Sequence, residues 1–255
     1  MAHIDRMLKE ERHSFIIREI NLHNKVLSSD LSAQLDVSED TIRRDLKELD
    51  EAGKVLKVHG GAISKAFHFP FSSKGEIFAQ DAKREIARKT IKLIKDGMVV
   101  LTGGGTTMIE LARMIPDDIR ATFFTISPLV ALELVEHPNL TVITIGGQLY
   151  KNAQVHMGSS VINALNEVHV DLCLLGVNGI SIQEGITDSD WEVVQVKRAM
   201  IRSAKKLAIM SIADKMNSVQ RMKVCNLNQA SYLITDLPVE DPRLALYRQQ
   251  EFKLL

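Results

Sequence analysis

The sequence predicts an α/β protein in two parts, and two patterns lead to this prediction. In the first 65 residues, short helical segments with one apolar face are followed by a pair of glycines typical of a tight hairpin. After Asp81, apolar segments of strand length alternate with segments of helical periodicity. This alternation favours a mainly parallel sheet with helices on both faces. We therefore expect a small N-terminal domain over 1–65 and a larger α/β domain over 79–255.

The composition is that of an ordinary globular protein. Among its 255 residues, 32 are basic and 32 are acidic, so any contact with nucleic acid has to come from a local patch. Two cysteines, Cys173 and Cys225, do not indicate a disulfide framework, and Cys173 lies in an apolar run where burial is expected. Because no apolar run reaches the roughly 18 residues of a membrane span, and the amino terminus is too polar for a secretory signal, we expect a cytoplasmic protein without a membrane partner. The histidines form no ligand cluster, and no metal or other cofactor is expected.

The segment Ser38–Asp50 is the centre of the N-terminal domain. Ile42, Leu46 and Leu49 recur at i, i+4 and i+7, which predicts a helix with one buried stripe, and Ser38 precedes it as a capping residue. A short helix with a polar, arginine-bearing face is what the major groove of DNA admits. The polar face and its flank carry Thr41, Arg43, Arg44, Lys47 and Glu48.

Two more helices and a hairpin surround this segment. Residues 9–24 predict a first helix, and Ser28 or Ser29 is expected to cap a second helix. Gly53 ends the third helix. Val55 and Ile63 are then expected to pair in a hairpin that turns at Gly60-Gly61. Together these elements predict a winged helix-turn-helix. The wing has no acidic residue and a local charge of three, which suits phosphate contacts, and it carries Lys54, Lys57, His59 and Lys65.

The charges of the third helix leave an alternative open. Between Ser38 and Glu51 there are three cations and six anions. A solvated surface helix with ion pairs along it has the same composition. Charge and periodicity alone therefore do not decide between a DNA-binding helix and an ordinary surface helix.

In the C-terminal domain, strands and helices alternate. The expected strands are 98–101, 121–126, 140–145, 170–177, 207–212 and 232–235. The expected helices are 81–95, 106–114, 129–136, 158–167, 190–204 and 243–251. Ligands of parallel sheets bind beyond the carboxyl ends of the strands, so the loops after these strands are the candidate binding region.

The loop after the first of these strands is rich in glycine. Thr102–Thr107 reads Thr-Gly-Gly-Gly-Thr-Thr and opens a helix, whose free N–H groups and positive dipole end attract an anion. A tight strand-to-helix turn has the same composition, and the loop matches neither the P-loop nor the dinucleotide fingerprint. Lys197 adds a positive charge, unless it is an ordinary surface lysine. The expected effector-binding residues are Gly103, Gly104, Gly105, Thr106, Thr107, Gly147, Asn178, Gly179, Asp188 and Lys197.

A linker is expected over 66–78. It contains Phe67, Phe69, Phe71 and Phe78, half of the eight phenylalanines in the chain. A flexible tether is not usually so aromatic. We expect these side chains to dock on the second domain or on a partner subunit, although packing without a functional consequence fits the pattern equally well.

Two stretches of the N-terminal domain resemble the DNA-binding module of the DeoR family of bacterial transcriptional regulators. They are Leu31–Leu46, with its Val-Ser and Thr-Ile-Arg-Arg-Asp-Leu pattern, and His59-Gly60-Gly61-Ala62. The resemblance covers nearly all of the first 65 residues. Asp45 is expected to be structural and to hold an arginine in place. The resemblance implies that Thr41, Arg43, Arg44 and Lys47 face DNA, and with Ser38, Lys57 and His59 they form the expected DNA-binding set.

The C-terminal domain resembles the sensor domain of the same family. The resemblance rests on the Gly-Gly-Gly-Thr-Thr turn, on Gly176-Val177-Asn178-Gly179 and on Val196–Met200. It implies a fold related to ribose-5-phosphate isomerase and the amino-sugar-phosphate isomerases, and an effector that is a phosphorylated sugar or a related metabolite. Thr102 stands where family members often carry Asp, and Ile126 where they often carry Asn. These departures remove a carboxylate and an amide that would contact sugar hydroxyls.

The leading interpretation is a DNA-binding transcriptional regulator, most often a repressor in this family, that a phosphorylated metabolite releases from its operator. Two recognition helices must reach two half-sites of a double-stranded DNA operator, so a homodimer or homotetramer is expected. An enzyme stays open as an alternative, because the α/β domain could isomerise a sugar phosphate with Asp188, Glu192 or Asp214 as general base. A DNA-binding scaffold with a vestigial pocket is a third interpretation.

Overall fold

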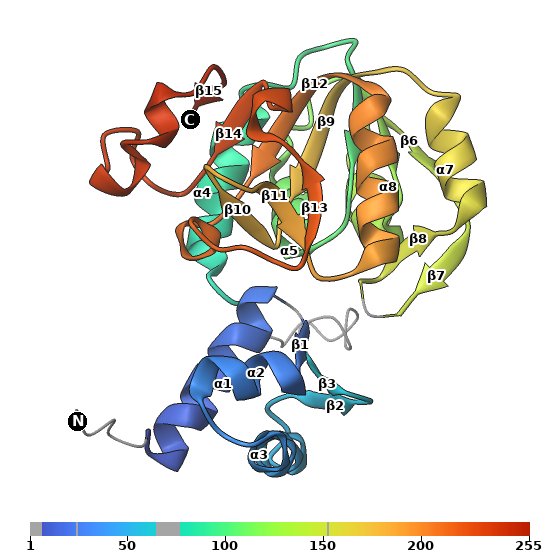
Figure 1. Cartoon of the computed structure of the whole chain (residues 1–255). Coiled ribbons are helices and arrows are strands. Elements are labelled where there is room, and N and C mark those ends of the chain that lie inside the picture. The colour runs from blue at the N-terminus through green and yellow to red at the C-terminus, as the bar shows by residue number, and fades with distance from the viewer. Residues whose placement is uncertain (1–6, 24, 65–76, 152) are drawn as a thin grey trace. The chain divides into compact units, whose positions relative to one another are not determined.

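The computed structural model describes residues 7–23, 25–64, 77–151 and 153–255 (Figure 1). The chain divides into two compact units, Met1–Phe78 and Ala79–Leu255. Of the aromatic linker expected over 66–78, only Ile77 and Phe78 fall inside the described residues. Within the described ranges, no helix has both the length and the apolar character that a membrane crossing requires.

The N-terminal unit combines three helices with a small antiparallel sheet. Its helices are α1 (Lys9–His23), α2 (Ser28–Leu35) and α3 (Glu39–Glu51). Its strands are β1 (Lys25–Leu27), β2 (Leu56–Val58) and β3 (Gly61–Ile63), in the order β1-β3-β2. The three expected helices and the expected hairpin are present, so the predicted winged helix-turn-helix is confirmed.

One hydrophobic core holds these helices together. Ile42, Leu46 and Leu49 of α3 are buried against Ile16 and Ile20 of α1. The three side chains of α3 are those that recur at helical spacing in the sequence. The apolar stripe is therefore the inner face of α3, and the charged face is left to solvent.

The hairpin differs from the prediction in register. Leu56 pairs with Ile63 and Val58 with Gly61, which leaves His59-Gly60 as a two-residue turn. The expected pairing of Val55 with Ile63 is wrong, because Val55 is fully buried in the helical core before the strand begins. The third strand, β1, was not predicted, since three residues are too few to show an alternating pattern.

The start of α2 also differs from the prediction. Leu27, and neither serine, occupies the N-cap position, and no side chain in the described part of the chain caps the helix. Ser28 is the first helical residue and is buried, and its N–H donates to the carbonyl of Gly60 at 2.8 Å. The backbone of the wing thus supplies an acceptor for the first N–H of α2, one of the N–H groups that have no partner inside the helix.

The C-terminal unit is built on a seven-stranded sheet in which every neighbouring pair is parallel. The strand order is β15-β14-β12-β9-β4-β5-β6. The chain enters at β4, proceeds outward to β6, and then returns to β9 on the other side of β4. The strands are β4 (Val99–Thr102), β5 (Ala121–Thr125), β6 (Leu140–Thr144), β9 (Val170–Gly176), β12 (Ala204–Met210), β14 (Tyr232–Ile234) and β15 (Lys253–Leu254).

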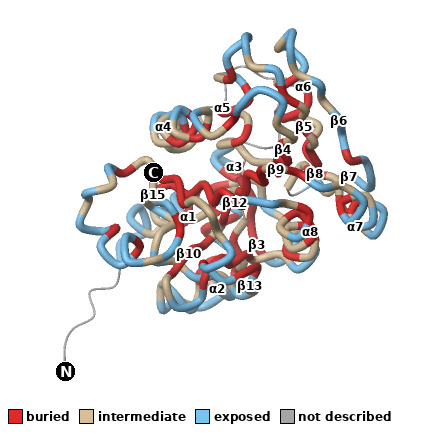
Figure 2. The backbone as a smooth tube through the Cα atoms, turned by 90° about the horizontal axis from the view of Figure 1, so that it is seen from above, coloured by how far each residue is buried: buried red, intermediate tan, exposed pale blue. Residues whose placement is uncertain are grey.

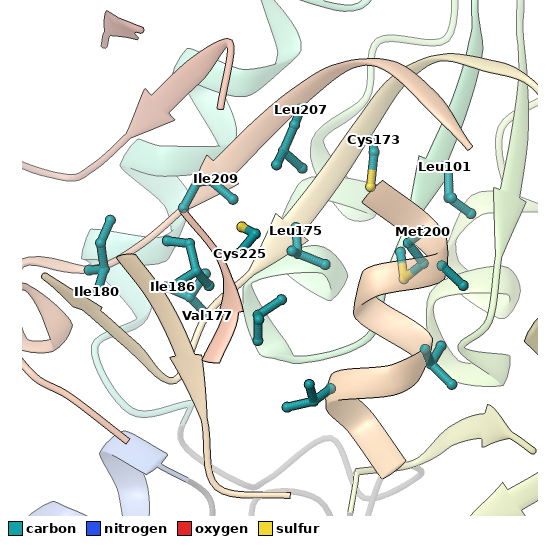
Figure 3. Packing of buried hydrophobic residues seen from close by; sticks show 14 of the residues in the cluster. Leu101, Cys173, Leu175, Val177, Ile180, Ile186, Met200, Leu207, Ile209 and Cys225 are labelled. Atoms are coloured by element: carbon teal, nitrogen blue, oxygen red, sulfur yellow. The ribbon is translucent and has the colours of Figure 1, made fainter. Parts of the chain in front are cut away.

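Helices cover both faces of this sheet, as predicted. On one face lie α4 (Gln80–Ile91), α5 (Thr106–Met114) and α6 (Pro128–Leu134), and on the other lie α7 (Ser159–Asn166) and α8 (Trp191–Arg202) (Figure 2). Leu101, Cys173 and Leu175, from the adjacent strands β4 and β9, belong to one buried cluster with Met200 of α8 (Figure 3). Cys173 is a free, fully buried thiol, as expected.

Two small antiparallel additions were not predicted. The hairpin of β7 (Gln148–Tyr150) and β8 (Val155–Met157) follows β6, and a three-stranded sheet consists of β10 (Gly179–Ser181), β11 (Gly185–Asp188) and β13 (Met222–Cys225). None of these strands exceeds four residues, so none shows a clear period. They matter for the site because Asp188 is the last residue of β11.

The helix expected over 243–251 is wrong. That segment forms two short 3₁₀ turns, Pro242–Leu244 and Tyr247–Gln249, before the edge strand β15. The buried hydroxyl of Tyr247 lies 3.0 Å from Oδ1 of Asn217 and donates to the carbonyl of Ile180. This anchor, together with the pairing of β15, prevents a continuous helix. The helix expected over 81–95 also ends early, at Ile91, and continues as 3₁₀-type turns.

Candidate functional site

The recognition helix α3 begins where the sequence predicts. Ser38 is its N-cap, and its Oγ accepts from the backbone N–H of Thr41 at 3.2 Å. The Oγ atom also lies 2.9 Å from Oγ1 of Thr41, so the two hydroxyls share a hydrogen bond. Both side chains are thereby oriented at the exposed amino end of the helix, the part that contacts base edges in helix-turn-helix proteins.

Asp45 fixes the orientation of α3. Its buried carboxylate accepts from Nε and Nη2 of Arg12 on α1, at 2.5 and 3.0 Å, and lies 3.1 Å from Nε2 of His13. Burial raises the pKa of Asp45, but the hydrogen bonds from Arg12 and His13 outweigh that effect and hold it below the ordinary aspartate value. The expectation that Asp45 holds an arginine is confirmed, and the arginine comes from α1.

The cations expected to contact DNA are on the surface. Arg43 forms ion pairs with Glu39 at 3.2 Å and Asp40 at 3.3 Å, and Lys47 lies 3.7 Å from Glu51. Arg44 is exposed and forms no ion pair or hydrogen bond with any residue that the structure describes. Of the expected DNA-binding residues, Ser38, Arg43, Arg44, Lys47, Lys57 and His59 are exposed and Thr41 is half-buried.

The wing is attached to the recognition helix. The backbone N–H of Lys57, on β2, donates to Oδ1 of Asp50 near the end of α3 at 3.1 Å. Its side chain remains exposed. One rigid unit therefore carries the cations of α3 and those of the wing. Lys65, which the sequence also assigns to the wing, lies outside the described residues.

In the larger unit, strand order reverses between β4 and β9. These neighbouring parallel strands pair Thr102 with Leu174, and their carboxyl ends lie at the same edge of the sheet. Chain segments leave this edge toward opposite faces, which is where open α/β sheets bind their ligands. The loop Gly103–Gly105 follows β4, and Val177-Asn178 follows β9.

The amino end of α5 has no side-chain cap from the residues that the structure describes. Gly105 occupies the N-cap position with φ of 105°. The first N–H groups of a helix have no partner within it, so this end can accept an anion. Thr106 and Thr107 form the first turn. Directly before the loop, the buried Oγ1 of Thr102 has no hydrogen-bond partner among the described residues, whereas most buried hydroxyls have one.

Asp188 binds two other sequence-predicted site residues at this edge, Lys197 and Asn178. Nζ of Lys197 lies 2.8 Å from its Oδ2 and 2.9 Å from the carbonyl oxygen of Gly176, and Nδ2 of Asn178 donates to its Oδ1 at 3.0 Å. Burial raises the pKa of Asp188, but the charge of Lys197 and these hydrogen bonds bring it below the ordinary value. Lys197 is thus a partly buried member of the cluster and not an ordinary surface lysine.

Sequence reasoning missed two lysines of the same cluster. Nζ of Lys215, after β12, donates to the carbonyl of Val177 at 2.9 Å, and lies 3.5 Å from Oδ1 of Asn178. Burial, together with the positive charges of Lys83 and Lys197, lowers the pKa of Lys215 to about 7. Lys83, near the start of α4, is buried, and burial lowers its pKa to about 8 despite the nearby Glu110.

A signal for Lys83 was present in the sequence. It precedes Ile86 by three residues and Thr90 by seven, so it lies on the buried stripe of α4. A lysine on an apolar stripe is a candidate for a buried charge. For Lys215, the only signal in the sequence was its position after a predicted strand.

At several of the glycines, a side chain would clash with neighbouring atoms. A Cβ atom on Gly104 would lie 2.5 Å from Cγ1 of Val155, and one on Gly147 would lie 2.6 Å from Cγ2 of Val161. One on Gly179 would lie 2.7 Å from Oγ1 of Thr187. At these positions the chain itself requires glycine, and the assignment of Gly104, Gly147 and Gly179 to effector binding remains a prediction. Gly103 is less crowded, since a Cβ atom there would lie 3.7 Å from Cε of Met200.

Comparison with known proteins identifies both units. Residues 79–237 match the model of the DeoR C-terminal sensor domain, and residues 12–66 match that of the DeoR-like helix-turn-helix domain. The chain belongs to the DeoR family. Its relatives in this family are transcriptional regulators, and this DeoR-family protein is a DNA-binding transcriptional regulator.

The relatives align over nearly their full length. The HTH-type transcriptional repressor GlcR of Bacillus subtilis is 34% identical over 232 residues, which cover 90% of this chain and 89% of GlcR. The glycerol-3-phosphate regulon repressor of Haemophilus influenzae is 28% identical over 235 residues, 91% of each chain. Among solved structures, ribose 5-phosphate isomerase A of Methanocaldococcus jannaschii is 18% identical over 54% of each chain with a TM-score of 0.39, a likeness too weak to bear on function.

Proposed function

We propose that this DeoR-family regulator is a repressor whose sensor domain binds a phosphorylated sugar or a related anionic metabolite, which releases the protein from its operator. The observation that carries the proposal is an excess of positive charge at the strand-order reversal. Lys83 and Lys197 both act electrostatically on Lys215 there. Asp188 is the carboxylate that Lys197 contacts, and Glu110 acts on Lys83. Such a cluster is costly to bury unless an anion joins it.

Each group of the cluster has a role toward such an effector. The free N–H groups at the start of α5 and the hydroxyls of Thr106 and Thr107 suit a phosphate. Lys215 and Lys83 supply the charge that balances it. Asp188 and Asn178, whose side chains are already hydrogen-bonded to each other, suit the hydroxyl groups of a sugar or polyol.

Lys197 retains the capacity for a ligand contact. An ammonium group has three N–H donors, and those of Lys197 reach the carbonyl of Gly176 and the carboxylate of Asp188. One donor therefore remains for the effector. The name of the Haemophilus influenzae relative, which refers to glycerol 3-phosphate, supports the same class of phosphorylated polyol or sugar.

Control of DNA binding requires two states of the protein. The effector must bind more tightly to the state in which a pair of recognition helices no longer matches two operator half-sites. This mechanism needs a homo-oligomer, because one winged helix-turn-helix reads one half-site. We therefore propose a homodimer or homotetramer.

The proposal is tested by effector-induced release of DNA. Operator fragments selected by the full-length protein from a random duplex library are titrated with glycerol 3-phosphate and with hexose and pentose phosphates. The unphosphorylated sugars and inorganic phosphate serve as controls. We expect release by a phosphorylated compound, loss of that response in Lys215→Met, and an unchanged response in Lys205→Met, which alters a lysine that is 73% exposed. Release by the unphosphorylated sugars, or an unaltered response in Lys215→Met, contradicts the proposed site.

The enzyme that the sequence left open is the second candidate, and the transcriptional regulators among the relatives do not favour it. The pKa of Lys215, about 7, suits proton transfer near neutral pH, and Lys215 acts electrostatically with Asp188. Isomerisation of a sugar phosphate is the reaction that such a pair could assist. Incubation of the protein with each aldose phosphate, followed by NMR of the sugar, tests for turnover.

A further inference from the structure

The outermost face of α3 is defined by side-chain exposure. Asp40, Lys47 and Glu51 are 74%, 67% and 64% exposed, whereas Glu39 and Glu48, on the two flanks, are 46% and 47% exposed. Helical spacing explains the difference, since the first three residues lie opposite the buried stripe of Ile42, Leu46 and Leu49. Arg44 completes this outer stripe and is also exposed.

Asp40 is thus placed at an unusual position for an acid. It lies in the first turn of the recognition helix, and the amino end of that helix is the part that meets base edges in the major groove. A carboxylate there is repelled by the phosphates. Among the groups on base edges, amino hydrogens are what a carboxylate can accept, and the cytosine N4 amino group is the usual partner of Asp.

We infer that Asp40 is a specificity-determining residue of this regulator, accepting a hydrogen bond from the N4 amino group of a cytosine in each operator half-site. The inference rests on α3 being the helix that enters the groove. Arg44, four residues further along the same stripe, would contact the next bases as a donor. A helix that presents an acceptor and then a donor distinguishes a C·G pair from its three alternatives more sharply than cations alone.

The ion pair of Asp40 does not prevent this contact. Oδ1 of Asp40 accepts from Nη1 of Arg43 at 3.3 Å, and both side chains are more than half exposed. Exposed pairs of this kind contribute at most about 1 kcal/mol, so they exchange readily for contacts with DNA. Separation of the pair also frees Arg43 for a phosphate or a base.

A purely structural role for Asp40 makes a different prediction. An acid in the first turn stabilises a helix through the helix dipole. Loss of that role would lower the melting temperature and weaken binding to every sequence alike. It would leave the order of preference among bases unchanged, so base preference is the decisive measurement.

The experiment compares the sequences selected by three forms of the full-length chain. The wild type, Asp40→Asn and Glu10→Gln each select from a random duplex library, and the enriched sites are aligned to give base preferences per position. Glu10, exposed in the first turn of α1, provides a matched control that removes one negative charge outside α3. Binding to a duplex of scrambled sequence and the melting temperature are measured for each form.

We expect the wild type and Glu10→Gln to prefer cytosine at the same position of each half-site, by about ten-fold over the other bases. In Asp40→Asn this preference should shift toward adenine, whose N6 and N7 match an amide. Identical base preferences in wild type and Asp40→Asn would overturn the inference. So would an Asp40→Asn protein that binds all sequences more tightly than wild type by the same factor. If the wild type enriches no sequence at all, DNA recognition by α3 itself fails, an outcome distinct from failure of the role of Asp40.

Discussion

Nζ of Lys197 lies 2.8 Å from Oδ2 of Asp188, and Asp188 is almost completely removed from solvent. The pair joins α8 to the end of β11 at the edge where the strand order reverses. The Lys197 side chain therefore has two functions. It neutralises a buried carboxylate, and it contributes positive charge to the proposed effector site.

Lys197→Met should therefore affect both stability and response. Removing one partner of a buried ion pair costs about 3 kcal/mol, because Asp188 is left without its counter-charge. Denaturant unfolding measures this loss, and effector-induced release of DNA should disappear. In the double variant Lys197→Met/Asp188→Asn, we expect part of the stability to return and the response to remain absent. A double variant that releases DNA at the wild-type effector concentration would show that Lys197 makes no ligand contact.

The affinity for an anionic effector should depend on pH through Lys215. Its pKa of about 7 means that its charge is lost as the pH rises through that value, so effector affinity should fall. Calorimetric titrations of wild type and Lys215→Met with the effector, at pH values below and above the Lys215 pKa of about 7, test the expectation. The variant should bind weakly and show a smaller change with pH. Equal pH dependence in the two proteins would exclude Lys215 as the titrating group.

The stability of the effector-free protein should change with pH in the opposite direction. The pKa of Lys215 is about 7 in the folded state and 10.5 ordinarily, so between these values the unfolded chain binds more protons. Stability conferred through Lys215 therefore rises as the pH increases from about 7 toward 10.5. Chemical unfolding at several pH values should give a smaller rise in Lys215→Met.

Asp45→Asn should destabilise the DNA-binding unit and remove part of its acid sensitivity. The folded-state pKa of Asp45 is below the ordinary 3.8, so its contribution is present above that value and is lost as the pH falls through the folded pKa. At neutral pH we expect a loss of about 3 kcal/mol, because Arg12 loses its counter-charge and an NH2 group replaces one of the two oxygens that face Arg12 and His13. Thermal unfolding of both proteins from neutral to acid pH checks this, and parallel curves would contradict it.

Arg44→Ala should weaken operator binding by about 1–3 kcal/mol if the side chain contacts a guanine. Arg44 forms no ion pair with the described residues, so no ion pair has to be broken before its side chain contacts DNA. Arg88→Ala is a matched control, since Arg88 is an exposed helical arginine of the other unit. Gel-shift titrations on a selected operator measure both variants. An affinity unchanged by Arg44→Ala excludes a base contact by this residue.

The long periodic segments of this chain could be predicted from sequence. Ile42, Leu46 and Leu49 mark the inner face of α3, and helix 106–114 is found at its predicted limits because a glycine turn and an apolar stripe agree. The parallel sheet follows from the alternation of strands and helices. In each case local pattern and tertiary burial point to the same structure.

The remaining features depend on contacts that the local sequence does not display. The strand β1 exists because β3 lies beside it, and the 3₁₀ turns near Tyr247 exist because its hydroxyl is anchored elsewhere in the unit. In the site, Asp188 and Asn178 could be predicted from their places at strand ends, and Lys197 from the helix that follows one of those ends. Lys83 was missed although its spacing to Ile86 and Thr90 places it on the buried stripe of α4, because the charged segment around it resembles a solvated surface.

The proposed effector site draws its groups from α4, from the loops after β4, β9 and β12, from the end of β11, and from α8. These segments span most of the sensor domain along the chain, and they meet only when the central strands are paired. No fragment lacking one of them can hold the complete set of charges. A ligand that binds there therefore binds only the folded domain. Its binding raises the free energy of unfolding of the whole domain, including every strand between its contacts.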